Sequence, residues 1–100
     1  MIVAFTTEMY RWAARTDADW FFAALPEDLS EEVRELQGPY RRGFGAVRVQ
    51  ATVGASTWRT SIFPGGDGGR YVLPLKRSVR DAEELYDGGP VPVTLEIAAA

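Results

Sequence analysis

The sequence predicts a β-rich α+β domain with about six strands and two short helices, and three observations support this fold class. Several segments alternate apolar and polar residues with the period of a half-buried strand, most clearly residues 47–53. Two segments, 28–37 and 76–86, have apolar residues at helical spacing instead. The order of strand, short helix and strand occurs twice along the chain, which favours two similar halves.

The N-terminal part of the chain is predicted to hold two strands joined by a turn. Residues 2–14 are rich in β-branched and aromatic side chains, and the polar residues 16–19 form the turn. Residues 20–25 are apolar on both faces, so this strand is expected to be central in its sheet, and Pro26 ends it.

A short amphipathic helix is predicted over residues 28–37. Its first turn is acidic, which suits the positive end of the helix dipole. Asp28 and Glu31 have the spacing of a capping box, and the Gly-Pro pair at 38–39 is expected to end the helix. The next residues, 41–45, have the sequence Arg-Arg-Gly-Phe-Gly and are predicted to form a loop.

The middle of the chain is predicted to be a β-hairpin. Residues 47–53 alternate valine or alanine with polar side chains, which is the clearest strand pattern in the sequence. Residues 54–56 turn the chain back, and residues 58–63 alternate again in the returning strand.

The last third of the chain repeats the order of strand, helix and strand. The glycine-rich segment 64–69 connects two strands, and residues 70–73 form a short strand closed by a proline. A second helix is expected over 76–86, and residues 91–97 form the last strand. Pro92 lacks an N–H group, so this strand should be an edge there, or the Pro92 nitrogen should point outward.

Two stretches of the sequence echo each other. Leu25-Pro26 ends a strand and is followed by Val33-Arg34 in a helix, and Leu73-Pro74 is followed in the same way by Val79-Arg80. A valine-rich alternating strand comes after each copy. The echo predicts two similar halves packed around a pseudo-twofold axis.

The second copy also contains Tyr71-Val72-Leu73-Pro74, Val79-Arg80 and Val91-Pro92-Val93 in that order. In this respect it resembles the half-barrel of the AbrB and MazE proteins, where two chains build one double-split β-barrel. Gly89 departs from that pattern, because it stands where the usual turn has an aspartate.

The whole chain, over about residues 3–97, carries a second set of motifs. They are Arg42-Gly43-Phe44-Gly45, Val47-Arg48-Val49, Thr57-Trp58-Arg59-Thr60-Ser61-Ile62-Phe63 and Tyr71-Val72-Leu73-Pro74-Leu75-Lys76. With these motifs the chain resembles the bacterial family known as domain of unknown function 1905. The resemblance implies a double-split β-barrel with both halves in one chain, and it implies no particular activity.

The composition excludes several kinds of functional site. The 100-residue chain contains no histidine and no cysteine. It therefore has no disulfide, no cysteine or histidine metal ligand, no thiol nucleophile and no imidazole acid or base. No carboxylate pair stands out as an acid/base couple, so we expect no catalytic residues, no metal and no cofactor. A single domain over residues 1–100 is expected, with a core over about 3–97 and a tail at 98–100.

The expected location of the protein is the cytoplasm. The longest aliphatic or aromatic run, residues 20–25, is far shorter than the roughly 20 residues that span a bilayer. The N-terminus has no basic flank and turns polar at Thr6, unlike a signal peptide. We therefore expect no membrane contact, and a monomer or a homodimer.

The formal net charge of −3 hides an uneven distribution. Residues 40–80 carry eight basic side chains and one acidic side chain, a charge of +7, whereas the rest carries three basic and thirteen acidic ones, a charge of −10. The basic segment predicts contact with an anion. The alternative is that the acidic helix over 28–37 covers the basic hairpin and neutralises it within the fold.

Eight side chains of the basic segment are candidates for ligand binding. They are Arg41, Arg42, Arg48, Trp58, Arg59, Ser61, Lys76 and Arg80. The first two precede a Gly-Phe-Gly loop, where guanidiniums and backbone N–H groups can hold a phosphate or carboxylate; solvated arginines are the alternative.

The remaining candidates depend on where the strand and helix periods place them. Trp58 is expected to point to the core, and Arg59 and Ser61 to the opposite face of the same strand. Arg48 is expected beside Arg59 across the hairpin, with either an anion or an acid of the helix between the two charges. Lys76, Arg77 and Arg80 lie near the start of the second helix, where they either bind an anion or neutralise acidic groups elsewhere. Lys76 and Arg80 are four residues apart and should share a helix face.

The sequence therefore favours a non-catalytic binding or interaction module. Its ligand would be an anionic small molecule or protein partner, and its site the basic face of the hairpin at 45–63. One alternative is a nucleic-acid-binding protein, by analogy with AbrB and MazE, which the acidic remainder of the chain disfavours. A second alternative is an enzyme that uses Arg59 and Ser61 with a carboxylate.

Overall fold

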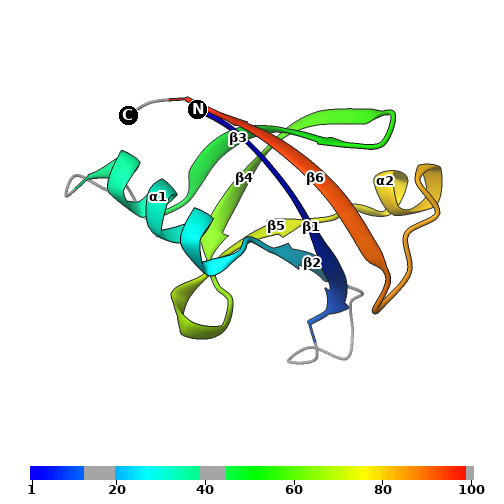
Figure 1. Ribbon diagram of the computed structural model, residues 1–100. Helices are drawn as coiled ribbons and strands as arrows, with labels where there is room; N and C mark the ends of the chain where they lie inside the picture. The colour runs from blue at the N-terminus through cyan, green and yellow to red at the C-terminus, as the bar shows by residue number, and fades with distance from the viewer. Residues whose placement is uncertain (13–19, 39–44, 99–100) are drawn as a thin grey trace.

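The structure is a computed structural model that describes residues 1–12, 20–38 and 45–98. Six strands, two α-helices and one 3₁₀ turn are found within these residues (Figure 1). In chain order they are β1 (Ile2–Arg11), β2 (Phe21–Ala24), α1 (Glu27–Gln37), β3 (Val47–Val53), β4 (Ser56–Pro64), the 3₁₀ turn η1 (Asp67–Gly69), β5 (Tyr71–Pro74), α2 (Arg77–Ala82) and β6 (Pro90–Ile97).

The strands close into one antiparallel barrel in the order β1-β2-β5-β4-β3-β6, which confirms the predicted β-rich α+β fold class. The apolar side chains of the alternating strands point inward and fill the barrel. In β6, for example, Val91, Val93, Leu95 and Ile97 are buried, and the residues between them are exposed. Figure 1 shows α1 and α2 at opposite sides of the barrel.

Two similar halves make up the barrel: β1, β2, α1 and β3 form the first half, and β4, β5, α2 and β6 form the second. β2 and β5 begin 50 residues apart, at Phe21 and Tyr71, and so do α1 and α2. The Leu25 N–H donates to the Tyr71 oxygen, and the Leu75 N–H donates to the Phe21 oxygen, both at 2.9 Å. β1 pairs β2 and β6, just as β4 pairs β5 and β3. The predicted pseudo-twofold relation is therefore confirmed.

The correspondence between the halves differs from the Leu-Pro match that predicted it. Leu25 corresponds to Leu75, not to Leu73, because these two leucines make the equivalent hydrogen bonds. The match of Val33 with Val79 holds, since both are buried in the helix that follows. Val33 comes eight residues after Leu25, and Val79 comes four after Leu75. The difference is about one helical turn.

Several element boundaries differ from the prediction. The capping box is wrong, because α1 begins one residue early, after Pro26, and makes no side-chain cap; Asp28 accepts from the adjacent Leu29 N–H at 2.9 Å. The second helix ends at Ala82, not at residue 86. The turn predicted over residues 16–19 lies outside the described residues.

The first strand ends at Arg11 rather than at the predicted residue 14, and residues 13–14 lie outside the described residues. The remaining predicted elements lie within two residues of their expected bounds. β3 has the predicted limits, and β4 extends the predicted return strand at both ends. The edge prediction for Pro92 is confirmed. β6 pairs β1 at this position, but its pairing with β3 involves only Thr94 to Ile97.

Candidate anion-binding groove

A groove of about 790 Å³ lies where the barrel splits between β4 and β5. These strands pair only through Phe63 and Pro64 of β4. From there β4 continues alongside β3, whereas β5 pairs with β2 and leads into α2. Trp58, Arg59 and Thr60 of β4 form one wall, the segment from Pro74 to Asp81 contributes the other, and Trp20 and Phe21 at the start of β2 complete the lining.

The groove carries excess positive charge. Among the described residues that line it, the basic ones are Arg59, Lys76, Arg77 and Arg80, and the acidic one is Asp81. The Arg77 Nε lies 3.7 Å from the Asp81 Oδ2, but both side chains are largely exposed, so this ion pair is weak. Within the described part of the chain, the other three basic side chains form no ion pair.

Arg80 is held firmly within this lining. Its Nε donates to the Leu75 backbone oxygen at 3.0 Å. Its guanidinium carbon lies 4.3 Å from the centre of the Phe21 ring, which is a cation–π contact. The positive charge is thereby fixed, and among the described residues no carboxylate forms an ion pair with it.

Trp20 at the rim of the groove is also held in place. Its ring stacks on Phe22, with centroids 6.5 Å apart and planes at 20°, yet the residue is 46% exposed. Phe22 lies at the centre of an aromatic cluster outside the barrel core, since its ring also contacts those of Tyr10, Trp12 and Phe63.

A second hollow, of about 420 Å³, adjoins the groove and shares Arg59, Thr60 and Pro74 with it. Arg48 and Ser61 also line this hollow, and they lie directly opposite each other in the pairing of β3 with β4. The two arginines are thus on one face of the hairpin, as the alternation predicts.

The eight predicted candidates therefore fall into three groups. Trp58, Arg59, Lys76 and Arg80 line the groove, and Trp58 also packs against the core as expected. Two more, Arg48 and Ser61, line the adjoining hollow. The remaining two, Arg41 and Arg42, lie outside the described residues.

The groove is only partly on the hairpin face at 45–63, because Trp20, Phe21 and the segment from Pro74 to Asp81 supply most of its lining. Sequence reasoning missed Trp20 and Phe21. Arg77 was considered together with Lys76 and Arg80 but was not among the eight candidates. Nothing local marked the two aromatic residues, which reach the site only because β2 pairs with β5.

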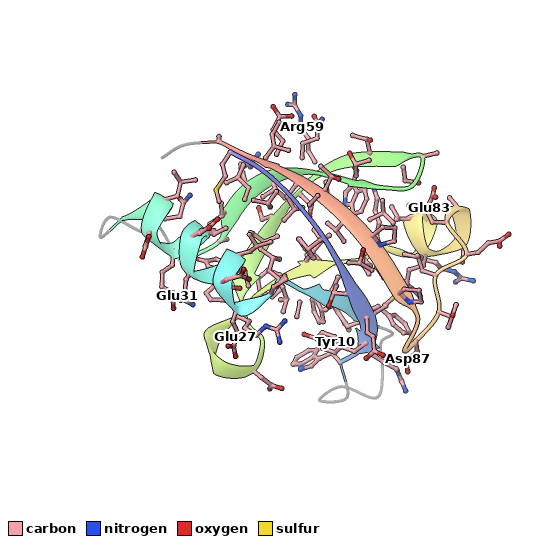
Figure 2. All side chains as sticks on the ribbon, in the orientation of Figure 1. Tyr10, Glu27, Glu31, Arg59, Glu83 and Asp87 are labelled. Atoms are coloured by element: carbon pink, nitrogen blue, oxygen red, sulfur yellow. The ribbon has the colours of Figure 1, made fainter. Side chains whose placement is uncertain are left out.

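The acidic helix does not cover the groove. Figure 2 shows Glu27 and Glu31 on α1, well separated from Arg59. The Glu31 carboxylate accepts a hydrogen bond at 2.8 Å from Arg34 of the same helix. Across the described residues, no ion pair joins a carboxylate of α1 to a basic side chain of the groove.

A third hollow, of about 360 Å³, lies at the split beside β1 and is the equivalent, in the first half, of the second hollow. In the strand pairing, Tyr10 lies opposite Phe22, and Phe63 lies opposite Val72. Phe22 and Val72 are equivalent positions of β2 and β5, so Tyr10 corresponds to Phe63 and, three residues earlier, Thr7 corresponds to Thr60. The charged residues among the described lining of the third hollow are Glu8, Asp67 and Arg70, so this part of the lining is not basic. Burial and the Asp67 charge raise the pKa of Tyr10, and the Arg70 charge opposes them in part.

The fold and the groove together define a closed six-stranded β-barrel protein with an internal repeat and a basic groove at one of its splits. The sequence model of the family described as domain of unknown function (DUF1905) matches residues 5–95, and the chain belongs to this family. No curated protein matches the chain. The predicted family resemblance is therefore confirmed, and the family description carries no activity.

Two further observations concern the described residues alone. None of their helices combines the length and the apolar character that a membrane span requires. Nor do their Asp and Glu side chains gather into a group of three or more that could hold a metal ion.

Proposed function

We propose that this protein is a non-catalytic binding module whose groove holds an anionic ligand. The observation that supports the proposal is the concentration of Arg59, Lys76, Arg77 and Arg80 around one groove, beside a single described carboxylate. The chain as a whole has a net charge of −3. The positive charge of the groove is therefore a local property that opposes the overall balance.

The side chains around the groove suit a multivalent anion. Arg80 presents a fixed guanidinium, since its contacts with Leu75 and Phe21 restrict it. Lys76 and Arg59 are exposed and free to approach a ligand from opposite walls. Guanidinium groups can donate two hydrogen bonds to one phosphate or carboxylate, and an ammonium adds a compact point charge.

Two other functions gain less support from the same geometry. An enzyme that uses Arg59 and Ser61 has these two side chains in one hollow, but the described lining of that hollow includes no carboxylate. A nucleic-acid-binding role, by analogy with AbrB and MazE, rests on the resemblance of the fold. A long polyanion would also meet the acidic remainder of the chain.

The proposal is tested by titrating the protein with inorganic triphosphate at about 50 mM salt, where charge screening is modest, and by following binding calorimetrically. We expect Arg59→Gln and Lys76→Gln each to weaken binding at least threefold. Thr6→Glu is the matched control: it changes the net charge by the same amount, and Thr6 takes the place of Arg59 in the first half. The proposal fails if the wild type binds no more tightly than the double variant Arg59→Gln/Lys76→Gln.

A further inference from the structure

We infer that the ligand of the groove is a free nucleoside phosphate, an aromatic base joined to a short phosphate chain. The inference rests on the proposed anion-binding function and adds the part of the ligand that is not charged. It starts from the aromatic side chains that share the groove with the basic ones.

Trp20 is a preformed stacking surface. The ring is held nearly parallel to Phe22, which is itself only 6% exposed, while Trp20 remains 46% exposed at the rim of the groove. A side chain already fixed by its neighbours loses little conformational freedom when a ligand stacks on it. A flat heteroaromatic ring is the kind of group that such a surface takes, as in proteins that bind nucleobases.

A second tryptophan faces the same space from another element. Trp58 of β4 is half-buried and lines the groove, as does Trp20 from the start of β2. Phe21, the third aromatic residue, has its ring covered by Arg80. Within the described lining, the two tryptophans are therefore the aromatic side chains left to contact an apolar part of a ligand.

The basic side chains lie in the same groove as the two tryptophans. Lys76 and Arg77 belong to the wall formed by the end of β5 and α2, and Arg59 to the wall formed by β4. An inorganic anion would use these charges but not the tryptophans, and an aromatic monoacid would use the tryptophans but only one charge. A nucleoside phosphate uses both. The groove, at about 790 Å³, falls within the usual size of small-ligand sites.

The charge outside the groove favours a free nucleotide over a nucleic-acid strand. The chain carries a net charge of −3 despite the basic groove. Beyond the adjoining hollow, Glu96 lines the surface next to Arg48 and Arg59. A nucleic-acid strand that extended past the groove would bring further phosphates toward Glu96 and the acidic remainder of the chain, whereas a mononucleotide would not.

The experiment compares adenosine triphosphate with inorganic triphosphate at equal ionic strength. We expect adenosine triphosphate to bind at least tenfold more tightly. Trp20→Leu should abolish this difference and leave the affinity for inorganic triphosphate unchanged. Trp12→Leu is the matched control, because Trp12 is also exposed, at 41%, and also contacts Phe22, but does not line the groove.

A second measurement does not depend on the variants. In two-dimensional NMR spectra of the wild type, adenosine triphosphate should shift the indole N–H signals of Trp20 and Trp58 but not that of Trp12. Trp20→Phe, which keeps an aromatic ring, should retain most of the tenfold difference.

The outcomes separate the two proposals. Equal affinity for the two triphosphates, with unshifted indole signals, overturns the nucleoside phosphate and leaves the anion-binding function standing. Absence of binding to both overturns the two together. Binding to a single-stranded hexanucleotide without binding to adenosine triphosphate would show that the ligand is a strand and overturn the free nucleotide.

Discussion

The guanidinium of Arg80 lies 4.3 Å from the centre of the Phe21 ring, and this contact joins the two halves of the barrel. The other half repeats it: the Arg34 guanidinium lies 5.8 Å from the centre of the Tyr71 ring. Phe21 and Tyr71 occupy equivalent positions at the starts of β2 and β5. Each helix therefore reaches over to an aromatic residue of the opposite half and, through its arginine, also donates to a backbone oxygen.

We predict that Arg80→Ala lowers the free energy of unfolding by about 1–2 kcal/mol, because it removes a cation–π contact and a hydrogen bond to Leu75. Arg80→Lys should recover only part of the loss, since lysine keeps the charge without the planar group. The control is Arg77→Ala, whose side chain is 85% exposed. Urea denaturation measures all three, and equal losses at the two positions would contradict the prediction.

Ser30 is predicted to be important for docking α1 on the barrel. The residue is 2% exposed, and its hydroxyl accepts a hydrogen bond of 3.1 Å from the Tyr71 backbone N–H. Ser30→Ala leaves that buried N–H without a partner and should cost about 1–3 kcal/mol of stability. Ser78→Ala, at an exposed position of α2, should change stability little. A loss below about 0.5 kcal/mol for Ser30→Ala in chemical denaturation would refute the role.

The β3–β4 turn should show energetic coupling between Gly54 and Glu83. The Glu83 carboxylate accepts hydrogen bonds from the Ser56 hydroxyl at 2.7 Å and the Ala55 N–H at 3.3 Å. Gly54 has a φ of 59°, and a Cβ there would collide with the Glu83 carboxylate. We predict that Gly54→Ala costs at least about 2 kcal/mol in the wild type, from strain and collision together.

In a Glu83→Ala background the same glycine substitution should cost less, because only the backbone strain is left. A double-mutant cycle measured by thermal or urea unfolding tests the coupling. Additive effects of the two substitutions would show that Glu83 does not restrict the turn.

Glu84→Gly is predicted to stabilise the protein. Glu84 has a φ of 53° at the end of α2, where the Leu85 N–H donates to the Arg80 oxygen at 2.9 Å. This is the geometry of a Schellman motif, which favours glycine at the left-handed position. We expect a gain of up to about 1 kcal/mol, measured as a higher melting temperature. Glu84→Ala, which keeps a Cβ, should show no such gain.

Alkaline pH should weaken the fold through Tyr10. Burial, and to a smaller extent Asp67, raises the pKa of this phenol above its ordinary value of 10.0, so the folded state retains a proton that the unfolded chain releases. The stabilisation is complete below about pH 10 and is lost as pH rises through the raised pKa. Tyr10→Phe should therefore lose less stability than the wild type between pH 9 and pH 11 in urea denaturation. Parallel losses would rule out this contribution.

Local patterns in the sequence were sufficient to predict the strands in which apolar and polar side chains alternate strictly. β3 and β6 follow the two-residue period and were predicted closely, because one face of each is buried in the barrel. The end of α2 could not be predicted, since Glu84 occupies the position at which glycine normally marks a helix end.

The candidate groove could be predicted from the sequence only in part, because its assembly depends on contacts between distant parts of the chain. Arg59, Lys76 and Arg80 were recognised from charge, which is visible in the sequence. That these residues share one groove with Trp20 depends on the pairing of β2 with β5 across 50 positions of the chain. No local periodicity encodes such a pairing.

The strand pairing has a consequence for how the two halves can diverge. β3 and β6 each pair with strands of the opposite half, and neither pairs with a strand of its own half. A separated half would leave such a strand unpaired and would complete the barrel only by associating with a second copy. Two identical copies would have to carry the same residues at both splits. Covalent fusion removes that constraint, so that one split can specialise toward a ligand while the other is free to serve stability alone.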